Sequence, residues 1–138
     1  MKAAKLVYNK PIFVIHLYSL TEIAQIVGGQ LHGNGSVIIQ NITTDSRKIQ
    51  LAESSLFVAI ITPKNDGHHY IAQTLRQHIA GLLVSEKPKE ESNYILVTNT
   101  LDALQKLTAY HRKQFSIPVI AITGSNGKTI VKEYINHL

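Results

Sequence analysis

A glycine-rich loop that ends in Lys-Thr is the part of the sequence whose residue types point most directly to chemistry. The loop runs through Gly124, Ser125, Asn126, Gly127, Lys128, Thr129 and Ile130. The apolar run at residues 119–122 predicts a strand before the loop, and residues 131–135 predict a helix after it. A strand, a glycine-rich loop, Lys-Thr and a helix in this order are typical of a loop that binds nucleotide phosphates.

Each part of this loop has a physical role in holding phosphate. The glycines allow backbone N–H groups to turn toward an anion, and the N-terminus of the following helix adds partial positive charge. Lys128 would reach the outer phosphates, and the hydroxyl of Thr129 would ligate Mg²⁺. Ile122 stands where the commonest form of the motif has a further glycine. The alternative interpretation is an ordinary strand-to-helix turn in which the lysine is coincidental.

The elements that must position this loop alternate between apolar strands and amphipathic helices. Short apolar runs predict strands at residues 37–39, 56–61, 81–84 and 94–97. Helical spacing of apolar residues predicts helices at about residues 20–27, 68–79 and 101–114. The alternation predicts an α/β fold with a mainly parallel sheet.

Local signals predict where the helices begin and end. Ser19 and Glu22 have the spacing of a capping box, and Gly28 ends the first helix. Asp66 and Thr100 are predicted to cap the second and third helices, and residues 31–35 are predicted to form a turn. The side chains predicted to face the core from these two helices are Ile71, Ala72, Leu75, Leu101, Ala103, Leu104, Leu107 and Tyr110.

Length and composition exclude several classes of protein. The chain has 138 residues, 44% of them hydrophobic and 17% charged, which suits one globular domain with a real core. It has no cysteine, which excludes a disulfide framework and thiolate metal sites and suits a reducing, cytoplasmic location. The apolar stretch at residues 11–20 is too short to span a bilayer, and no signal-peptide cleavage site follows it.

The net charge of +5 has two interpretations, a solvated basic surface or a phosphate-rich partner. The basic residues are scattered along the chain, and aromatic residues make up only 7% of it. Nucleic-acid binding usually needs a continuous basic track. We therefore expect a small anionic ligand and no nucleic acid.

Three stretches together resemble the Mur ligases of peptidoglycan synthesis. The stretches are Thr-Asp-Ser-Arg at 44–47, the strand at 56–59 followed by Asp-Gly-His at 66–68, and the loop at 124–129. The first predicted helix and residues 131–133 are most similar to the branch that adds D-alanyl-D-alanine. Residues 124–133 are also similar to a subgroup whose ligase is fused to an alanine racemase. The resemblance covers residues 18–138.

The resemblance implies an ATP-dependent ligase. In that family, ATP phosphorylates the terminal carboxylate of a UDP-N-acetylmuramoyl peptide, and the incoming amine displaces phosphate from the acyl phosphate. The substrates would be UDP-N-acetylmuramoyl-tripeptide and D-alanyl-D-alanine, with Mg²⁺ as cofactor, and we expect a monomer. The alternative within the family is the sister ligase that adds the third amino acid.

The family has three domains, and the comparison implies how this chain divides. Residues 1–17 would be an extension, residues 18–114 the N-terminal domain that binds the UDP substrate, and residues 115–138 the start of the central ATP-binding domain. The catalytic residues of the family lie beyond Leu138. We therefore expect the 138-residue chain to be inactive by itself, and a stand-alone domain that binds a UDP ligand is the alternative function.

The resemblance also implies which residues bind the UDP substrate. They are Thr44, Ser46, Arg47, Pro63, Lys64 and Asn65. Arginine suits a pyrophosphate because its guanidinium matches two oxygens. The structural alternatives are a local Asp45–Arg47 ion pair and a solvated lysine in a loop. The adjacent pair His68–His69 is a weak metal candidate, because neighbouring residues do not share a helix face.

Overall fold

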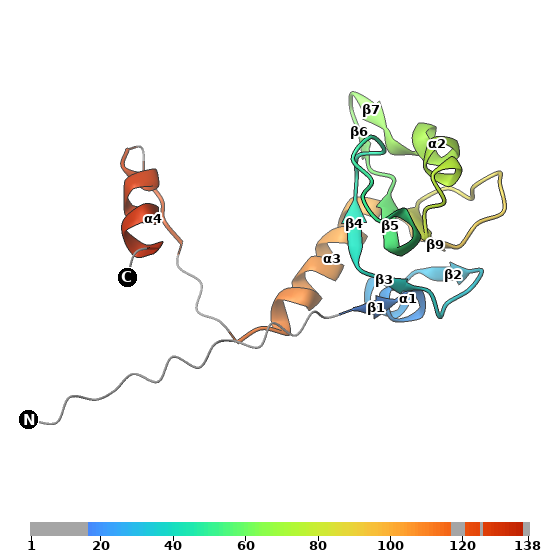
Figure 1. Cartoon of the computed structure of the whole chain (residues 1–138), viewed down its shortest axis with the longest axis horizontal. Coiled ribbons are helices and arrows are strands. Elements are labelled where there is room, and N and C mark those ends of the chain that lie inside the picture. Colours follow the sequence, from blue (N-terminus) through green and yellow to red (C-terminus); the bar gives the residue numbers. More distant parts are fainter. Residues whose placement is uncertain (1–16, 117–120, 125, 137–138) are drawn as a thin grey trace, which may run out of the picture.

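The computed structural model describes residues 17–116, 121–124 and 126–136. The first of these ranges forms one α/β domain, and the last carries a separate helix (Figure 1). The extension at residues 1–16 lies outside the described residues, and so do residues 119 and 120 of the strand predicted at 119–122. Residues 121–124 are described and form no strand.

A five-stranded sheet forms the centre of the domain, in the order β2-β9-β8-β5-β4. Its strands are β2 (Gln30–His32), β4 (Asn41–Thr43), β5 (Ser55–Val58), β8 (Gly81–Val84) and β9 (Tyr94–Leu96). Neighbours from β4 to β9 are parallel, and only β2 pairs antiparallel, at one edge. The predicted α/β fold with a mainly parallel sheet is therefore confirmed.

Two short antiparallel pairs flank this sheet. β1 (Tyr18–Ser19) pairs with β3 (Ile38–Ile39), and β6 (Ile61–Thr62) pairs with β7 (Asn65–Asp66). The second pair is a small hairpin that follows β5. It therefore extends from the carboxyl end of a central strand.

Helices cover both faces of the sheet. The helical segments are α1 (Leu20–Val27), η1 (Ala52–Ser54), η2 (Gly67–Tyr70), α2 (Ile71–Arg76), α3 (Thr100–Lys113) and α4 (Lys128–Asn136). Helices α1 and α3 pack with Leu56, Val58 and Leu83 in one core, whereas α2 packs with Phe57, Leu82 and Val84 in the other. Successive residues of β5 and β8 thus point to opposite faces, which explains why both strands are apolar throughout.

The predicted capping box of α1 is present. The Ser19 hydroxyl accepts a hydrogen bond from the backbone N–H of Glu22 at 3.2 Å, and the Glu22 carboxylate accepts from the Ser19 N–H at 2.7 Å. Gly28 then ends the helix with φ of 71°. The capping box thus gives hydrogen-bond partners to two backbone N–H groups at the N-terminus of α1, and Gly28 lets the chain change direction at its C-terminus.

Several local predictions were wrong. Residues 31 and 32, the first two of the predicted turn at 31–35, belong to edge strand β2. The helix predicted at 68–79 is a 3₁₀ turn followed by the six-residue α2, in which Ala72 is exposed and Thr74 is buried. Leu101 and Tyr110 are also exposed, each at 43%.

Helix α4 exposes apolar side chains. Ile130, Val131, Tyr134 and Ile135 are exposed by 60, 44, 72 and 38%. Figure 1 shows this helix apart from the sheet. In the described part of the chain, no helix combines the length and apolar character needed to cross a membrane.

Candidate functional site

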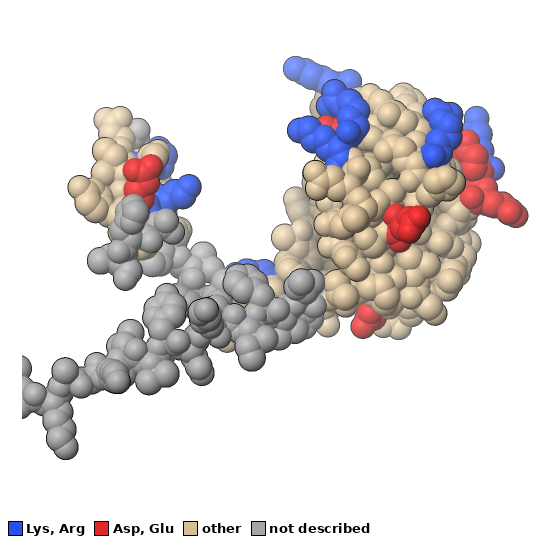
Figure 2. All heavy atoms as spheres, viewed as in Figure 1, with Lys and Arg blue, Asp and Glu red and all other residues tan. Residues whose placement is uncertain are grey.

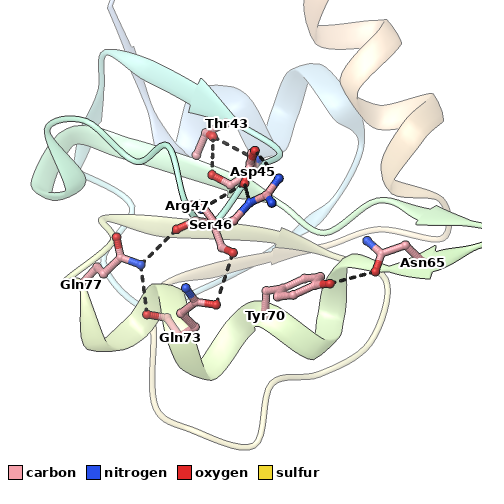
Figure 3. Close-up of polar contacts among 8 residues, drawn as sticks. All are labelled: Thr43, Asp45, Ser46, Arg47, Asn65, Tyr70, Gln73 and Gln77. Atoms are coloured by element: carbon pink, nitrogen blue, oxygen red, sulfur yellow. Dashed lines mark hydrogen bonds and ion pairs between the residues drawn. The ribbon is translucent and has the colours of Figure 1, made fainter.

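A cavity of about 500 Å³ opens beside the carboxyl end of β4. Its lining consists of Thr44, Asp45, Ser46, Arg47, Asn65, Tyr70 and Gln73. Figure 3 shows all of these side chains except Thr44. We call this cavity the site cavity. One wall is the turn that follows β4, and the other comes from β7, η2 and α2. In open parallel sheets, ligands bind outside the carboxyl ends of the strands.

The turn at residues 43–48 is held by its own hydrogen bonds. The Thr43 hydroxyl accepts from the Asp45 N–H and donates to the Asp45 carbonyl oxygen, both at 3.2 Å. The Lys48 N–H donates to the same carbonyl at 3.1 Å. This closed arrangement fixes the first wall of the cavity.

Asp45 and Arg47 form a bidentate ion pair at the mouth of the cavity. The Arg47 Nε and Nη2 donate to the two Asp45 carboxylate oxygens at 2.9 and 3.0 Å, and the Arg47 backbone N–H donates at 3.0 Å. The Arg47 hydrogen bonds lower the pKa of the Asp45 carboxyl to about 2. The Arg47 side chain is nevertheless 81% exposed, so the guanidinium also faces solvent at the cavity. The predicted local ion pair is therefore present.

Ser46 is fixed from the opposite wall. It is 5% exposed, and its hydroxyl donates to Gln73 Oε1 at 3.4 Å. The Gln77 side-chain amide donates to the Ser46 carbonyl oxygen at 3.1 Å. Gln73 of α2 and the C-cap residue Gln77 therefore hold the turn in place, one through the Ser46 hydroxyl and the other through its backbone carbonyl.

The second wall contains one predicted residue and lacks two others. Asn65 lines the cavity, and its Oδ1 accepts a hydrogen bond from the Tyr70 hydroxyl at 3.0 Å. Pro63 and Lys64 lie at the exposed tip of the β6–β7 hairpin and do not line the cavity. The structure thus brings together Thr44, Ser46, Arg47 and Asn65 from two distant segments.

The sequence prediction missed three polar residues beside these four. Tyr70 and Gln73 line the cavity, and Gln77 anchors its first wall. Their spacing of three and four residues is that of one helix face. Polar side chains recurring at this spacing were therefore the signal that could have found them.

Positive charge gathers at the same end of the domain. Figure 2 shows Lys and Arg side chains over the region of β6, β7 and the end of β4. The sequence places Arg47, Lys48 and Lys64 in these loops. Such a surface favours an anionic ligand over a neutral one.

The loop that contains Gly124 and Gly127 leads into α4, so the helix predicted at residues 131–135 is present. Gly124 and Gly127 have φ of 149° and 79°, values that residues with a side chain rarely adopt. Helix α4 begins at Lys128, whose ammonium donates to the Gly124 carbonyl oxygen. Thr129 and Ile130 are exposed in the first turn, and Ser125 lies outside the described residues.

Among the described residues, His68 and His69 have no neighbouring set of side chains of the kind that holds a metal ion. In the described ranges, no three His, Cys, Asp or Glu side chains come close enough to hold a metal ion. His68 instead contacts Asp66 and Ser85.

Known proteins similar in sequence are ligases of peptidoglycan synthesis. The UDP-N-acetylmuramoyl-tripeptide–D-alanyl-D-alanine ligase of Buchnera aphidicola (from Acyrthosiphon pisum) is 38% identical over 115 residues, covering 83% of this chain and 25% of that relative. The Escherichia coli protein of the same name is 35% identical over 115 residues, with the same two shares. The chain spans about a quarter of the length of these curated relatives. No protein-family model matches the chain.

Solved structures give the same result. A D-alanyl-D-alanyl ligase from Acinetobacter baumannii matches with a TM-score of 0.79 and 30% identity, covering 88% of this chain and 28% of that one. The MurF ligase of Thermotoga maritima, solved in complex with ADP, matches with a TM-score of 0.61 and 30% identity over 71% of this chain and 22% of that one. By sequence and by fold, the chain belongs to the Mur ligase family.

Proposed function

We propose that this chain binds the UDP end of UDP-N-acetylmuramoyl-tripeptide for a ligase that adds D-alanyl-D-alanine. The observation that carries the proposal is the site cavity, where residues 44–47 and Asn65 meet although they are about twenty positions apart. The names of the relatives supply the UDP substrate class. The cavity volume of about 500 Å³ is in the range of small-molecule sites.

The groups in the cavity suit a nucleoside diphosphate. Arg47 offers a planar fork for pyrophosphate oxygens. Ser46, Asn65 and Gln73 offer hydroxyl and amide groups that can both donate and accept, as uracil and ribose require. Tyr70 offers an aromatic face beside them. Pro63 and Lys64, at the hairpin tip, are proposed to contact the more distant parts of the substrate.

We also propose that residues 124–130 bind ATP phosphates. The support is the positive φ of Gly124 and Gly127, the helix that begins at Lys128, and the ADP complex of the Thermotoga relative. The lysine ammonium has three donors, so its bond to Gly124 leaves others for phosphate. Thr129 would supply one oxygen to Mg²⁺, which typically takes few protein ligands and several from phosphate and water. Bound ATP would supply the phosphoryl group that activates the peptide carboxylate.

The test is a titration of the 138-residue chain with uridine, UMP and UDP, using Arg47→Gln as the variant. We expect UDP to bind more tightly than uridine. Arg47→Gln should weaken UDP binding about tenfold, the effect of one charge-assisted pair, and leave uridine binding unchanged. The matched control is Lys89→Gln, which removes a lysine from a loop outside the site cavity.

Each outcome of this titration decides something. Equal loss of uridine and UDP affinity would show that Arg47 supports the fold of the turn and not the phosphates. No binding of any of the three compounds would refute the uridine site. Tight ATP binding with no response to UDP would indicate that the chain binds nucleotide through the loop at 124–130 and not through the site cavity.

The sister ligase remains the second candidate because one relative carries its name. The Bacteroides fragilis UDP-N-acetylmuramoyl-L-alanyl-D-glutamate–2,6-diaminopimelate ligase is 30% identical over 107 residues, covering 74% of this chain. Both ligases are named for UDP-muramyl substrates, so the site cavity suits either. Comparing UDP-N-acetylmuramoyl-dipeptide with the tripeptide as ligand distinguishes them, and we expect the tripeptide to bind more tightly.

A further inference from the structure

His68 forms a bridge between the second wall of the site cavity and the central sheet. Its Nδ1 lies 2.7 Å from Asp66 Oδ1, and its Nε2 lies 3.0 Å from the backbone nitrogen of Ser85. Asp66 ends β7, and Ser85 directly follows β8. The imidazole is 8% exposed and therefore belongs to the interior.

The partners of His68 determine where its proton lies. A backbone N–H can only donate, so Nε2 must accept from Ser85 and carries no proton. The single proton of the neutral ring then sits on Nδ1 and is donated to Asp66. The same Asp66 oxygen accepts the His68 backbone N–H at 2.8 Å, and these hydrogen bonds lower the pKa of the Asp66 carboxyl.

The order Ser85–His68–Asp66 resembles the triad of serine hydrolases, but the geometry does not suit that chemistry. The Ser85 hydroxyl lies 3.3 Å from Nε2, farther than the backbone nitrogen that already occupies the lone pair. A ring with its lone pair occupied cannot accept the serine proton. The cluster therefore has a structural role.

His68 cannot act on a ligand in the site cavity directly. It borders a different cavity of about 290 Å³, whose lining shares no residue with the site cavity. However, the segment that it anchors carries Asn65 on one side and Tyr70 on the other, and these two residues form the hydrogen-bonded second wall. Movement of residues 66–68 away from β8 would displace both.

We propose that His68, as a neutral Nδ1–H imidazole, is a positioning residue that holds Asn65 and Tyr70 in place for the UDP substrate. The inference rests on the proposed function of the site cavity. A second anchor, the Gly67 N–H to the Ile60 carbonyl at 2.9 Å, holds the base of the hairpin. His68 adds the link to the neighbouring strand, which that hydrogen bond does not provide.

Three substitutions separate the two bonds of the imidazole. His68→Ala removes both, His68→Gln can keep an acceptor near Nε2 for Ser85, and His68→Asn can keep a donor near Nδ1 for Asp66. His69→Gln is the matched control, since His69 is exposed and adjacent in sequence. UDP affinity is measured by calorimetry on the 138-residue chain, and circular dichroism confirms that each variant is folded.

We expect His68→Ala and His68→Asn to weaken UDP binding about tenfold, as the loss of one or two hydrogen bonds would. His68→Gln should recover most of that loss, and His69→Gln should equal the parent chain. Should His68→Ala not fold, the Gln and Asn variants alone carry the comparison. Imidazole ¹⁵N shifts of the parent chain should show the Nδ1–H tautomer.

Other results would overturn the inference. Unchanged UDP affinity in the Ala or Asn variant, a Gln variant no better than Ala, or an Nε2–H tautomer would each contradict it while leaving the uridine site intact. A parent chain that binds no UDP would instead refute the proposed function, and this inference with it.

Discussion

Replacing Gly67 with alanine should damage both the stability of the domain and the site cavity, because no space exists for a methyl group. A Cβ built at Gly67 would lie 2.7 Å from the Ile60 backbone nitrogen and 2.8 Å from both the carbonyl carbon and the Cα of Ala59. Carbon atoms attract at about 3.5–4.0 Å and repel strongly below that. All three neighbours are backbone atoms, which cannot rotate away.

The size of the effect follows from what must move. Ala59 is fully buried, and its N–H donates to the Leu83 carbonyl at 3.0 Å, so the β5 side cannot yield. The hairpin must move instead, which strains or breaks the bond from Gly67 to the Ile60 carbonyl. Overpacking costs about 1–3 kcal/mol and a hydrogen bond about 1 kcal/mol, which together give roughly 2–4 kcal/mol.

Urea denaturation measures this loss, and the control is Gly28→Ala. Gly28 has φ of 71° but nothing within 4 Å of its built Cβ, so only backbone strain of about 1–2 kcal/mol applies there. We expect Gly67→Ala to lower the urea midpoint by roughly 1–3 M, more than the control does. It should also weaken UDP binding, since Asn65 and Tyr70 adjoin the displaced segment, whereas Gly28→Ala should not. A Gly67→Ala chain as stable as the control would refute the argument from close approach.

Two further predictions concern hydrogen bonds in the domain. Thr100→Val should cost about 1–3 kcal/mol in urea denaturation, because the buried Thr100 hydroxyl donates to the Ala59 carbonyl at 2.8 Å, and Thr100→Ser should cost less because it keeps the hydroxyl. The Asp45 carboxyl should titrate at about 2 in an NMR experiment, against an ordinary value of 3.8, and Arg47→Gln should raise this pKa. Because the pKa of Asp45 is lower in the folded chain, the ion pair stabilises the fold at pH values above the ordinary pKa of 3.8, and this stabilisation is lost as the pH falls through about 2. An unchanged Asp45 pKa in Arg47→Gln would contradict the assigned cause.

Sequence patterns predicted the elements that are held together by continuous apolar burial. The strands at β5, β8 and β9 and the capping box of α1 follow from local composition alone. Strand β2 does not, since Leu31 is the one apolar residue in it and its flanking residues are exposed. Its register against β9 is fixed by a partner more than sixty residues away, which no local pattern contains.

The cap of α3 shows the same limit. Thr100 was predicted as the cap, but Asn99 takes that position and accepts from the N–H groups of residues 101 and 102 at 2.9 and 3.1 Å. Both residue types are good caps. The choice depends on the Ala59 carbonyl, which binds the Thr100 hydroxyl from the end of β5. Long-range contacts therefore decide between local alternatives that are nearly equal.

The sequence likewise predicted some residues of the candidate site and missed others. Resemblance to a family supplied Ser46, Arg47 and Asn65, because motif residues can be matched without knowing how they meet. It did not supply Gln73 and Gln77, whose role depends on α2 lying across the turn at residues 44–47. A family motif therefore identifies only some of the residues that build this site. The helix that closes the site, α2, is identified by polar side chains that share one helix face and by the turn that this face covers.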